Sequence, residues 1–294
     1  MPRLYDFIDA QTLSELIETA RLEDLGPESS DITSACFIPQ DAKAAAHLVP
    51  RQAGVIAGLA VLGCVCEVYG GQVEVTLQAA DGDPAKPGTA VATLAGPLRD
   101  VLAIERVALN LLTHLSGITT LTAQYAARCA GTRAKVYDTR KTLPGLRGLQ
   151  KYAVACGGGA THRIGLYDAM LIKDNHLAGV ELDDLAARLT GAATQARQTN
   201  PNLKFVEVEV DTLEQLEQVL KAEVDIVLLD NMGPAILAQA VSMRTCQAPH
   251  IELEASGGIS LDTVSEIAQT GVDRISIGAL THSAPSLDIG LDIH

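Results

Sequence analysis

The pattern of hydrophobic and polar positions changes character near residue 117 of the chain. Before that point, residues 11–22 place apolar side chains at helical spacing, with Thr12 and Glu15 as a predicted capping box. Short runs with strand-like patterning follow, at residues 44–49, 72–78 and 89–94. This first part is therefore predicted to be a small α+β domain.

The segment 98–115 has the strongest amphipathic pattern in this first part and predicts a helix. Arg106, Asn110 and His114 recur every four residues, so they share one face of that helix. Such a stripe is usually a solvated face. An arginine with two uncharged polar residues, in place of Lys and Glu pairs, favours a partner surface or a binding site.

After residue 117, buried strand-like runs alternate with helical segments. The strand-like runs are residues 134–138, 169–173, 204–210, 226–229, 251–255 and 274–277. The helical segments are residues 182–198, 213–222, 235–243 and 261–270. This order predicts a parallel sheet and favours a barrel. A complete (β/α)8 barrel has eight strands and the pattern gives six, so an open or incomplete barrel is expected.

Composition and charge exclude several classes of protein. Hydrophobic residues make up 47% of the 294, which excludes a disordered chain, and aromatic residues make up 3%, which argues against single-stranded nucleic-acid binding by stacking. The net charge of −14 argues against a DNA or membrane-surface binder. The sequence shows no bilayer-length apolar run, no signal core and no CxxC pair, so we expect a cytoplasmic protein with reduced thiols.

Polar, chemically capable residues end each of the predicted parallel strands. The endings are Asp138-Thr139-Arg140-Lys141, Lys173-Asp174-Asn175-His176, Glu207 and Glu209, Asp230-Asn231, Ser256-Gly257-Gly258, and Gly278-Ala279-Leu280. Turns favour Asp, Asn and Gly, but turn chemistry alone is a poor explanation for six such endings on one rim. Because barrel active sites lie at the carboxyl ends of the strands, this rim is the candidate site.

The charge of one segment stands out against the acidic chain. Residues 133–173 hold eight Lys or Arg and two Asp, a net +6. A cationic island of this kind predicts a site for a small molecule with several negative charges, since Arg recognises carboxylates and phosphates bidentately. The alternative is a basic helix face packed against an acidic neighbour.

Glycines and carboxylates sharpen the prediction. Ser256-Gly257-Gly258 is predicted to follow a strand and open a helix, as a phosphate cradle does, and Gly157–Gly159 is predicted to be a flexible loop that delivers His162 and Arg163. Glu207 and Glu209 alternate in one strand, so they share a face and are expected in the barrel lumen. With Asp230, Glu209 is suited to hold sugar hydroxyls or Mg²⁺. The alternative is a structural ion pair to a lumen Lys or Arg.

These residues belong to segments that resemble a known family. The segments are LEDLGPESSDIT, ERVALNLLTHLSGITT, DTRKTLPGLR, KYAVACGGGATHRIGLYDAMLIKDNH, EVEVDTLEQL, VLLDNM, ASGGI and ISIGALTHS. Together they resemble the quinolinate phosphoribosyltransferase family over nearly the whole chain. The resemblance implies transfer of a phosphoribosyl group from 5-phosphoribosyl 1-pyrophosphate to quinolinate, with loss of CO₂, to give nicotinate mononucleotide and pyrophosphate in NAD biosynthesis.

The resemblance also implies roles for individual residues. The implied quinolinate ligands are Arg106, Thr139, Arg140, Lys141, His162, Arg163 and Lys173. The implied contacts of 5-phosphoribosyl 1-pyrophosphate are Lys141, Lys173, Glu209, Asp230, Ser256, Gly257, Gly258, Gly278, Ala279 and His282. Lys141, Glu209 and Asp230 are the implied catalytic residues, with Mg²⁺ carried by the pyrophosphate near Glu209 and Asp230. The one local departure is Thr161, where many relatives have Asn.

The architecture implied by the resemblance has three parts. These are an N-terminal α/β sandwich domain at 1–116, an open α/β barrel that carries the active site at 117–280, and a C-terminal segment at 281–294 that returns toward the N-terminal domain. The implied assembly is a homodimer with shared active sites, in which Arg106 reaches the neighbouring subunit, and a hexamer is also compatible.

Two other readings stay open at the level of sequence. One is an aldolase on a similar barrel, with Lys141 or Lys173 as a Schiff-base lysine. The other is an inactive or transport-associated relative that binds a phosphosugar. A purely structural protein does not explain the strand-end residues.

Overall fold

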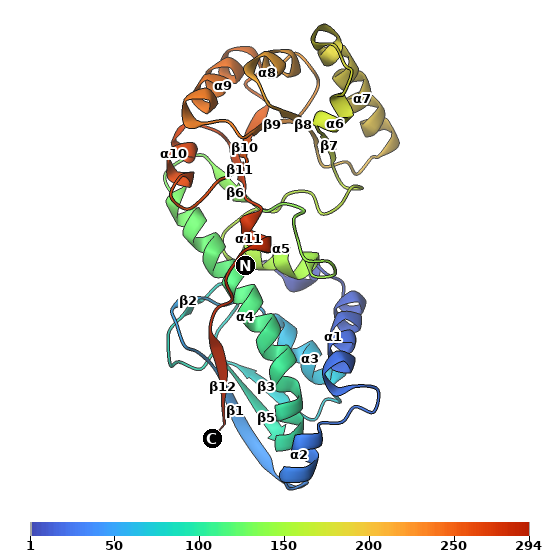
Figure 1. Ribbon diagram of the computed structural model, residues 1–294, viewed down its shortest axis with the longest axis vertical. Coiled ribbons are helices and arrows are strands. Elements are labelled where there is room, and N and C mark those ends of the chain that lie inside the picture. Colours follow the sequence, from blue (N-terminus) through green and yellow to red (C-terminus); the bar gives the residue numbers. More distant parts are fainter. Residues whose placement is uncertain (1, 294) are drawn as a thin grey trace. The chain divides into compact units, whose positions relative to one another are not determined.

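The computed structural model describes residues 2–293, and its chain divides into two compact units (Figure 1). The first unit comprises the residues up to Ala123, Thr142–Gly158 and the residues from Leu280 onward. The second comprises Gln124–Lys141 and Gly159–Ala279. Each unit is therefore assembled from segments that are far apart in the sequence.

The first unit is built on a four-stranded antiparallel sheet of order β12-β1-β5-β3. Its strands are β1 (Lys43–Pro50), β3 (Glu74–Leu77), β5 (Ala92–Pro97) and β12 (Ile289–Ile293), and a second pair is β2 (Gly54–Val55) with β4 (Pro84–Ala85). Its helices are η1 (Leu4–Asp6), α1 (Ala10–Leu25), α2 (Ile32–Phe37), η2 (Leu59–Val61), α3 (Leu62–Val68) and α5 (Arg147–Cys156). The last strand of the chain thus pairs with the first.

Helix α1 confirms the predicted N-terminal helix, but its cap differs from the predicted one. Asp9 is the N-cap residue, and its carboxylate accepts from the backbone N–H of Thr12 at 2.9 Å and from the Thr12 hydroxyl at 2.6 Å. The Thr12–Glu15 capping box is therefore wrong. An Asp at the N-cap fills the same need, since its carboxylate satisfies an orphan N–H of the first turn.

Helix α4 (Leu98–Arg128) is longer than predicted and runs through residue 117 without a break. Its length and hydropathy of 1.3 are compatible with a membrane span, but 56% of its most apolar window is buried inside the protein, as in the core helix of a soluble domain. Gly117 lies on this helix where a Cβ would stand 2.1 Å from the carbonyl oxygen of Pro285. The glycine lets the C-terminal segment pass against the helix backbone on its way to β12.

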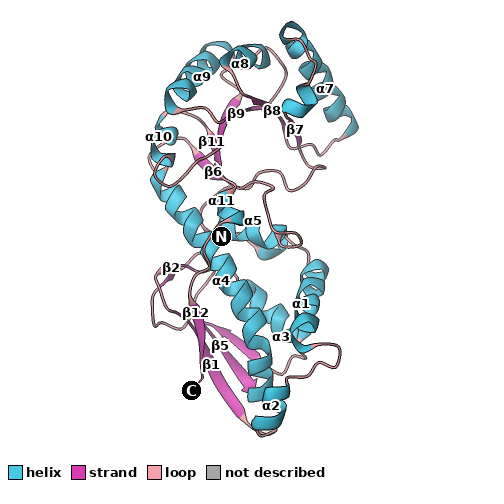
Figure 2. Cartoon of the chain, viewed as in Figure 1, coloured by secondary structure: helices cyan, strands magenta, loops and turns pink. Residues whose placement is uncertain are grey.

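The second unit is a six-stranded parallel sheet of order β6-β11-β10-β9-β8-β7 (Figure 2). Its strands are β6 (Lys135–Tyr137), β7 (Met170–Ile172), β8 (Val206–Val210), β9 (Ile226–Asp230), β10 (Glu252–Ser256) and β11 (Arg274–Ser276). The helices are α6 (Asp174–Leu177), η3 (Leu182–Asp184), α7 (Leu185–Thr199), α8 (Leu213–Val219), α9 (Pro234–Gln247) and α10 (Val264–Gln269), and α11 (Ala279–His282) follows β11.

The sheet confirms the predicted fold class and the six predicted strands. Strands β6 and β7 are its edges, and no hydrogen-bonded ladder joins them within residues 2–293, so the barrel is open. Helices α8, α9 and α10 lie along the outer side of the curved sheet (Figure 2). Parallel strands leave all their carboxyl ends at one edge, which is where the candidate site lies.

Candidate active site

Most residues singled out by the sequence lie in the second unit, at or beyond the carboxyl ends of its strands. These are Thr139, Arg140 and Lys141 after β6, His162 and Arg163 in the segment before β7, Lys173 after β7, Glu209 in β8, Asp230 in β9, Ser256, Gly257 and Gly258 at the end of β10, and Gly278 and Ala279 after β11. Arg106 and His282 belong to the first unit.

The cationic segments after β6 and before β7 are joined by a buried aspartate. Asp138 is fully buried, and its Oδ1 accepts from the backbone N–H of His162 at 2.8 Å. Burial, with the positive charge of nearby Arg140, lowers the pKa of Arg163. Two guanidinium groups that repel each other mark a place suited to an anion, as the charge of residues 133–173 predicted.

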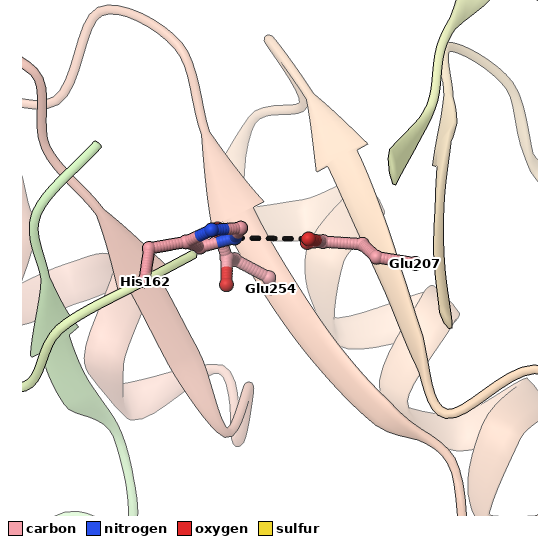
Figure 3. Close-up of side chains that lie close together, drawn as sticks. All are labelled: His162, Glu207 and Glu254. Atoms are coloured by element: carbon pink, nitrogen blue, oxygen red, sulfur yellow. Dashed lines mark ion pairs between the residues drawn. The ribbon is translucent and has the colours of Figure 1, made fainter. Parts of the chain in front are cut away.

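Behind these cations lies a group that we call the interior charge cluster, made of His162, Glu207, Glu254 and Arg274. His162 Nε2 lies 2.9 Å from a carboxylate oxygen of Glu207 and 3.5 Å from one of Glu254 (Figure 3). Arg274 Nε donates to Glu254 at 2.6 Å. All four side chains are at most 7% exposed. Glu207 therefore forms an ion pair, but with a histidine and not with the Lys or Arg of the predicted alternative.

Burial and charge act in opposite directions on the cluster. Burial alone would lower the pKa of His162, but the hydrogen bonds and negative charges of Glu207 and Glu254 raise it to about 9. Burial and the Glu254 charge raise the pKa of Glu207. Burial also opposes ionisation of Glu254, but His162 and Arg274 outweigh it and lower the pKa of Glu254. The interactions within the cluster thus favour a proton on His162 and the ionised form of Glu254.

Glu209 stands two residues further along β8 and has a different partner. Its carboxylate accepts from the Lys173 ammonium, across the β7–β8 pair in which Ile172 is in register with Val208. The Glu209 side chain is 12% exposed and that of Lys173 is 42% exposed. Both groups therefore lie at the solvent-accessible rim, where a substrate can reach them.

The ends of β9 and β10 are locked together by one close approach. Asn231 has a φ of 54°, its N–H donates to the Ser256 carbonyl at 2.9 Å, and its amide donates to Asp230 at 2.6 Å. Gly257 has a φ of 93°, and a Cβ there would stand 2.1 Å from Asn231 Oδ1. Only glycine fits this position, because both the backbone conformation and the space exclude a side chain.

Two sequence expectations about glycine segments are corrected. Helix α10 begins at Val264, so Ser256-Gly257-Gly258 forms a turn and does not open a helix directly. Gly157 is buried, and a Cβ there would stand 2.6 Å from the carbonyl oxygen of Thr119 on α4. The first glycine of the triplet is therefore a packing residue at the end of α5 rather than part of a flexible loop.

The remaining predicted residues have fewer described contacts. The Lys141 backbone N–H donates to the Thr139 hydroxyl at 3.0 Å, and the Lys141 side chain is exposed. Arg106 is 62% exposed, with Glu105 3.8 Å away, whereas His114 accepts or donates at 2.9 Å to Gln150 and is half-buried. The predicted polar stripe of α4 is thus open to solvent at Arg106 and packed at His114.

Sequence reasoning missed Glu254 and Arg274. Both stand in strands that were predicted, and the run IELEA has the same alternation of Glu with apolar residues as VEVEV in β8. An Arg between the apolar residues of VDRISI is equally unusual for a buried strand. Charged residues inside predicted buried strands were the available signal. The interaction partners of Glu254 and Arg274 could not be predicted from the sequence, because they lie on other segments of the fold.

Metal-ligating geometry is found in one place among residues 2–293. His162, Glu207 and Glu254 each offer a ligand atom, all within 4.8 Å of one another. Arg274 stands against this set, and His162 Nδ1 accepts the Arg163 backbone N–H at 2.8 Å, which requires a proton on Nε2. The cluster is therefore filled by a proton and a guanidinium rather than arranged for a cation.

Comparison with known proteins shows which family the chain is similar to. Two family models match it: the N-terminal domain of quinolinate phosphoribosyl transferase over residues 31–116 and its C-terminal domain over residues 118–292. The chain is 45% identical to the nicotinate-nucleotide pyrophosphorylase (carboxylating) of Mycobacterium leprae, covering 90% of this chain and 91% of that protein. It is 36% identical to a mitochondrial quinolinate phosphoribosyltransferase (decarboxylating) of Nicotiana tabacum, covering 96% and 82%.

Solved structures agree with the sequence comparison. The nicotinate-nucleotide pyrophosphorylase of Francisella tularensis superposes with a TM-score of 0.87 at 33% identity, covering 98% of each chain. That of Ehrlichia chaffeensis superposes with a TM-score of 0.85 at 37% identity, covering 96% of this chain and 98% of the other. The likeness extends over both compact units.

Proposed function

The chain belongs to the quinolinate phosphoribosyltransferase family of carboxylating nicotinate-nucleotide pyrophosphorylases, enzymes of NAD biosynthesis, and we propose a role for each rim residue in that reaction. The observation that supports the proposal is the gathering of the motif residues at the carboxyl ends of one parallel sheet. The substrates proposed for this chain are quinolinate and 5-phosphoribosyl 1-pyrophosphate.

Quinolinate is held by the cations after β6 and before β7. Arg140 and Arg163 lie close enough to repel each other, and two carboxylates of one ring relieve that repulsion. Lys141, exposed beyond Thr139, reaches the junction of the two substrates, as does Lys173. His162 contributes to this site from the protein interior, because its ring faces the carboxylates of Glu207 and Glu254.

The phosphosugar is held on the opposite part of the rim. Ser256, Gly257 and Gly258 form the turn that receives the 5′-phosphate, with Gly278 and Ala279 after β11 completing the contacts within the second unit. Gly257 and Gly258 have positive φ values of 93° and 60°, and because neither carries a Cβ, the backbone of this turn can approach a phosphate closely. Glu209 and Asp230 accept hydrogen bonds from the ribose hydroxyls.

Mg²⁺ is proposed to arrive with the pyrophosphate. The carboxyl ends of β8 and β9 suit this ion, because Glu209 and Asp230 offer carboxylate oxygens there. The two residues are brought near each other by the strand register, in which Val210 pairs with Leu229. When bound, the ion supplies neutralisation of the leaving pyrophosphate charge. Among residues 2–293, no third His, Cys, Asp or Glu groups with Glu209 and Asp230, which suits an ion carried by the substrate.

The chemistry follows from where charge develops. Departure of pyrophosphate leaves positive character at C1 of the ribose, which the Glu209 and Asp230 carboxylates stabilise. The ring nitrogen of quinolinate attacks C1 and becomes a pyridinium, whose positive charge stabilises the electron pair left on the neighbouring ring carbon when CO₂ departs. A proton from water is then added to that carbon, which gives nicotinate mononucleotide. Arg140, Arg163 and Lys141 orient the carboxylates, so that decarboxylation depends on orientation.

The proposed assembly is a homodimer with shared sites. Arg106 supports it, since this arginine is 62% exposed on α4 and its nearest described carboxylate is 3.8 Å away. In the dimer Arg106 adds a cation to the quinolinate site of the partner, and a hexamer built from three such dimers is compatible with this. The enzyme is proposed to be cytoplasmic, which fractionation of the source cells tests.

The test is an assay of purified protein with quinolinate, 5-phosphoribosyl 1-pyrophosphate and Mg²⁺, following nicotinate mononucleotide and CO₂ together. Nicotinate serves as the parallel substrate. Equal amounts of product and CO₂ from quinolinate alone support the proposal. Binding of the phosphosugar without any product would instead favour the inactive relative.

The Schiff-base aldolase is the weaker alternative. A Schiff-base lysine needs a desolvated pocket, whereas the Lys141 side chain is exposed and that of Lys173 is 42% exposed. Borohydride treatment in the presence of a carbonyl substrate is expected to leave Lys141 and Lys173 unmodified, and a trapped adduct on either lysine would revive the aldolase.

A further inference from the structure

Of the interior charge cluster, only His162 has been given a role above, and Glu207, Glu254 and Arg274 are buried charged side chains without one. His162, Glu207, Glu254 and Arg274 come from four separate segments, and Figure 3 shows the first three side chains converging. Glu207 Oε1 has no hydrogen-bond partner among the described residues. A protein core holds such charges only at a cost, so their arrangement calls for a reason beyond packing.

His162 is held on both sides of its ring. Nε2 faces Glu207 at 2.9 Å and Glu254 at 3.5 Å, and Nδ1 accepts the Arg163 backbone N–H at 2.8 Å. The ring also packs edge-on against Phe205, with centroids 5.3 Å apart. Both nitrogens are thus engaged with the protein, and Nε2 carries a proton whether the ring is neutral or charged.

The orientation of this ring is transmitted to the cations at the rim. Its Nδ1 fixes the peptide that carries Arg163, and its own backbone N–H donates to Asp138 at 2.8 Å. Asp138 is the residue that leads into Thr139 and Arg140. The cluster is therefore connected by one hydrogen bond to the backbone of Arg163 and by another to Asp138, which lies two residues before Arg140.

Arg274 completes the support from the far side. Its Nε donates to Glu254 at 2.6 Å, and its guanidinium lies 3.8 Å from the centre of the Tyr137 ring. Tyr137 is the last residue of β6, directly before Asp138. Side chains from β6, β8, β10 and β11 therefore all contribute to the surroundings of the His162 imidazole.

We propose that Glu207, Glu254 and Arg274 are positioning residues that hold His162, and through it Arg163 and Arg140, in the geometry that binds the two carboxylates of quinolinate. This inference rests on the proposed function. It gives His162 the role of positioning the quinolinate site. It predicts that changes in the cluster raise the KM for quinolinate and leave the KM for 5-phosphoribosyl 1-pyrophosphate unchanged.

The test compares Glu207→Gln and Glu254→Gln with Glu252→Gln. Glutamine keeps the size of the side chain and removes its charge. Glu252 is the matched control, since it stands on the same strand as Glu254, lies 3.4 Å from Arg274 and is 51% exposed. The cluster variants are expected to raise the KM for quinolinate about tenfold or more, with the KM for 5-phosphoribosyl 1-pyrophosphate within about twofold of wild type.

Several outcomes overturn the proposal. A folded Glu207→Gln or Glu254→Gln enzyme with the wild-type KM for quinolinate removes the positioning role. An equal rise in both KM values leaves a structural role only. A control variant that shifts the quinolinate KM as much as Glu254→Gln does shows that charge near Arg274, and not the cluster, is responsible.

A second measurement on the unmodified protein applies if the variants do not fold. His162 is the one buried histidine among residues 2–293, so its Nε2–H is expected to be the slowest-exchanging ring proton in ¹⁵N-histidine NMR spectra. Quinolinate added alone is expected to move that signal, and inorganic phosphate is not. A signal unmoved at saturating quinolinate overturns the proposal, whereas a moved signal in a protein that forms no nicotinate mononucleotide overturns the proposed function instead.

Discussion

Glu207 and Glu209 are two residues apart on the same strand and face the same side of the sheet, yet they occupy opposite environments. Glu207 is fully buried and faces His162, whereas Glu209 is 12% exposed and holds the half-exposed Lys173. One carboxylate is enclosed by fixed partners. The other has a partner that can rotate away, which leaves it free for a substrate.

The two glutamates illustrate two roles of charged side chains in the second compact unit. In the interior, each group is held by several others, so removal of one leaves a buried charge without compensation. At the rim, the surrounding water compensates a lost partner, so the cost to stability is small. We therefore expect interior variants to lose stability and rim variants to lose activity.

Arg274→Met tests the interior half of the comparison. Without the guanidinium, Glu254 and Glu207 face each other with only His162 between them, and we expect the free energy of unfolding to fall by about 3–5 kcal/mol. Urea denaturation measures this. Arg197→Met is the matched control, because Arg197 pairs with Asp225 at 2.9 Å but both are about half exposed, and the expected loss there is at most about 1 kcal/mol. Equal losses would erase the distinction.

Glu209→Gln tests the rim half. The carboxylate that stabilises C1 of the ribose is lost, so kcat/KM is expected to fall about a thousandfold, equivalent to about 4 kcal/mol of transition-state stabilisation. The midpoint of thermal unfolding is expected to stay within about 2 °C. The control is Glu217→Gln, which removes an exposed ion pair between Glu217 on α8 and Lys221. This variant should leave both kcat/KM and the unfolding midpoint unchanged. A Glu209→Gln enzyme within tenfold of wild type contradicts the assigned role.

The pH dependence of stability sharpens the contrast. The pKa of His162 is about 9 in the folded protein and about 6.5 for an unperturbed histidine. Because the folded value is the higher one, its stabilisation is complete below about pH 6.5 and is lost as pH rises through 9, by up to about 3 kcal/mol. The Arg163 N–H that faces Nδ1 works against a second proton and reduces this amount. Unfolding free energies at pH 6.5 and 9.5 measure it, and a His162→Gln protein should lack this component.

Gly257→Ala and Gly258→Ala have the smallest expected effects and form their own matched pair. Both glycines have positive φ, but a Cβ at Gly257 meets Asn231 Oδ1 at 2.1 Å and a Cβ at Gly258 meets nothing within 4 Å. Both are expected to lose about 1 kcal/mol to backbone strain, and Gly257→Ala about 1 kcal/mol more together with a raised KM for 5-phosphoribosyl 1-pyrophosphate. Identical KM values for the two variants would show that the Asn231 contact is irrelevant to the cradle.

The sequence predicted well wherever a pattern was local and repeated. All six parallel strands were found because buried strands and turns recur at a regular spacing, and the faces of Glu207 and Glu209 followed from the two-residue period of a strand. Local chemistry with several solutions was less predictable. The cap of α1 moved to Asp9 because Asp and Thr serve equally well at that position.

What the sequence could not supply was pairing across the barrel. Nothing in VEVEV says that Glu207 meets His162, which lies 45 positions earlier in the printed sequence, and not the Lys or Arg that was expected. Likewise, Gly157 carries no mark that distinguishes a packing glycine from a flexible one until the Thr119 carbonyl lies beside it. Such contacts depend on the fold as a whole.

The pairing of β12 with β1 has a consequence for how the chain is made. Val49 is in register with Gly290, so the edge of the antiparallel sheet is completed by a strand that is synthesised after all six strands of the parallel sheet. The parallel unit has all its strands by Ser276, but the sheet of the first unit must wait with β1 unpaired on one side. Folding order thus differs from synthesis order: the sheet that contains β1 is completed after the strands of the parallel sheet, and the open edge of β1 is exposed to self-association until β12 is made.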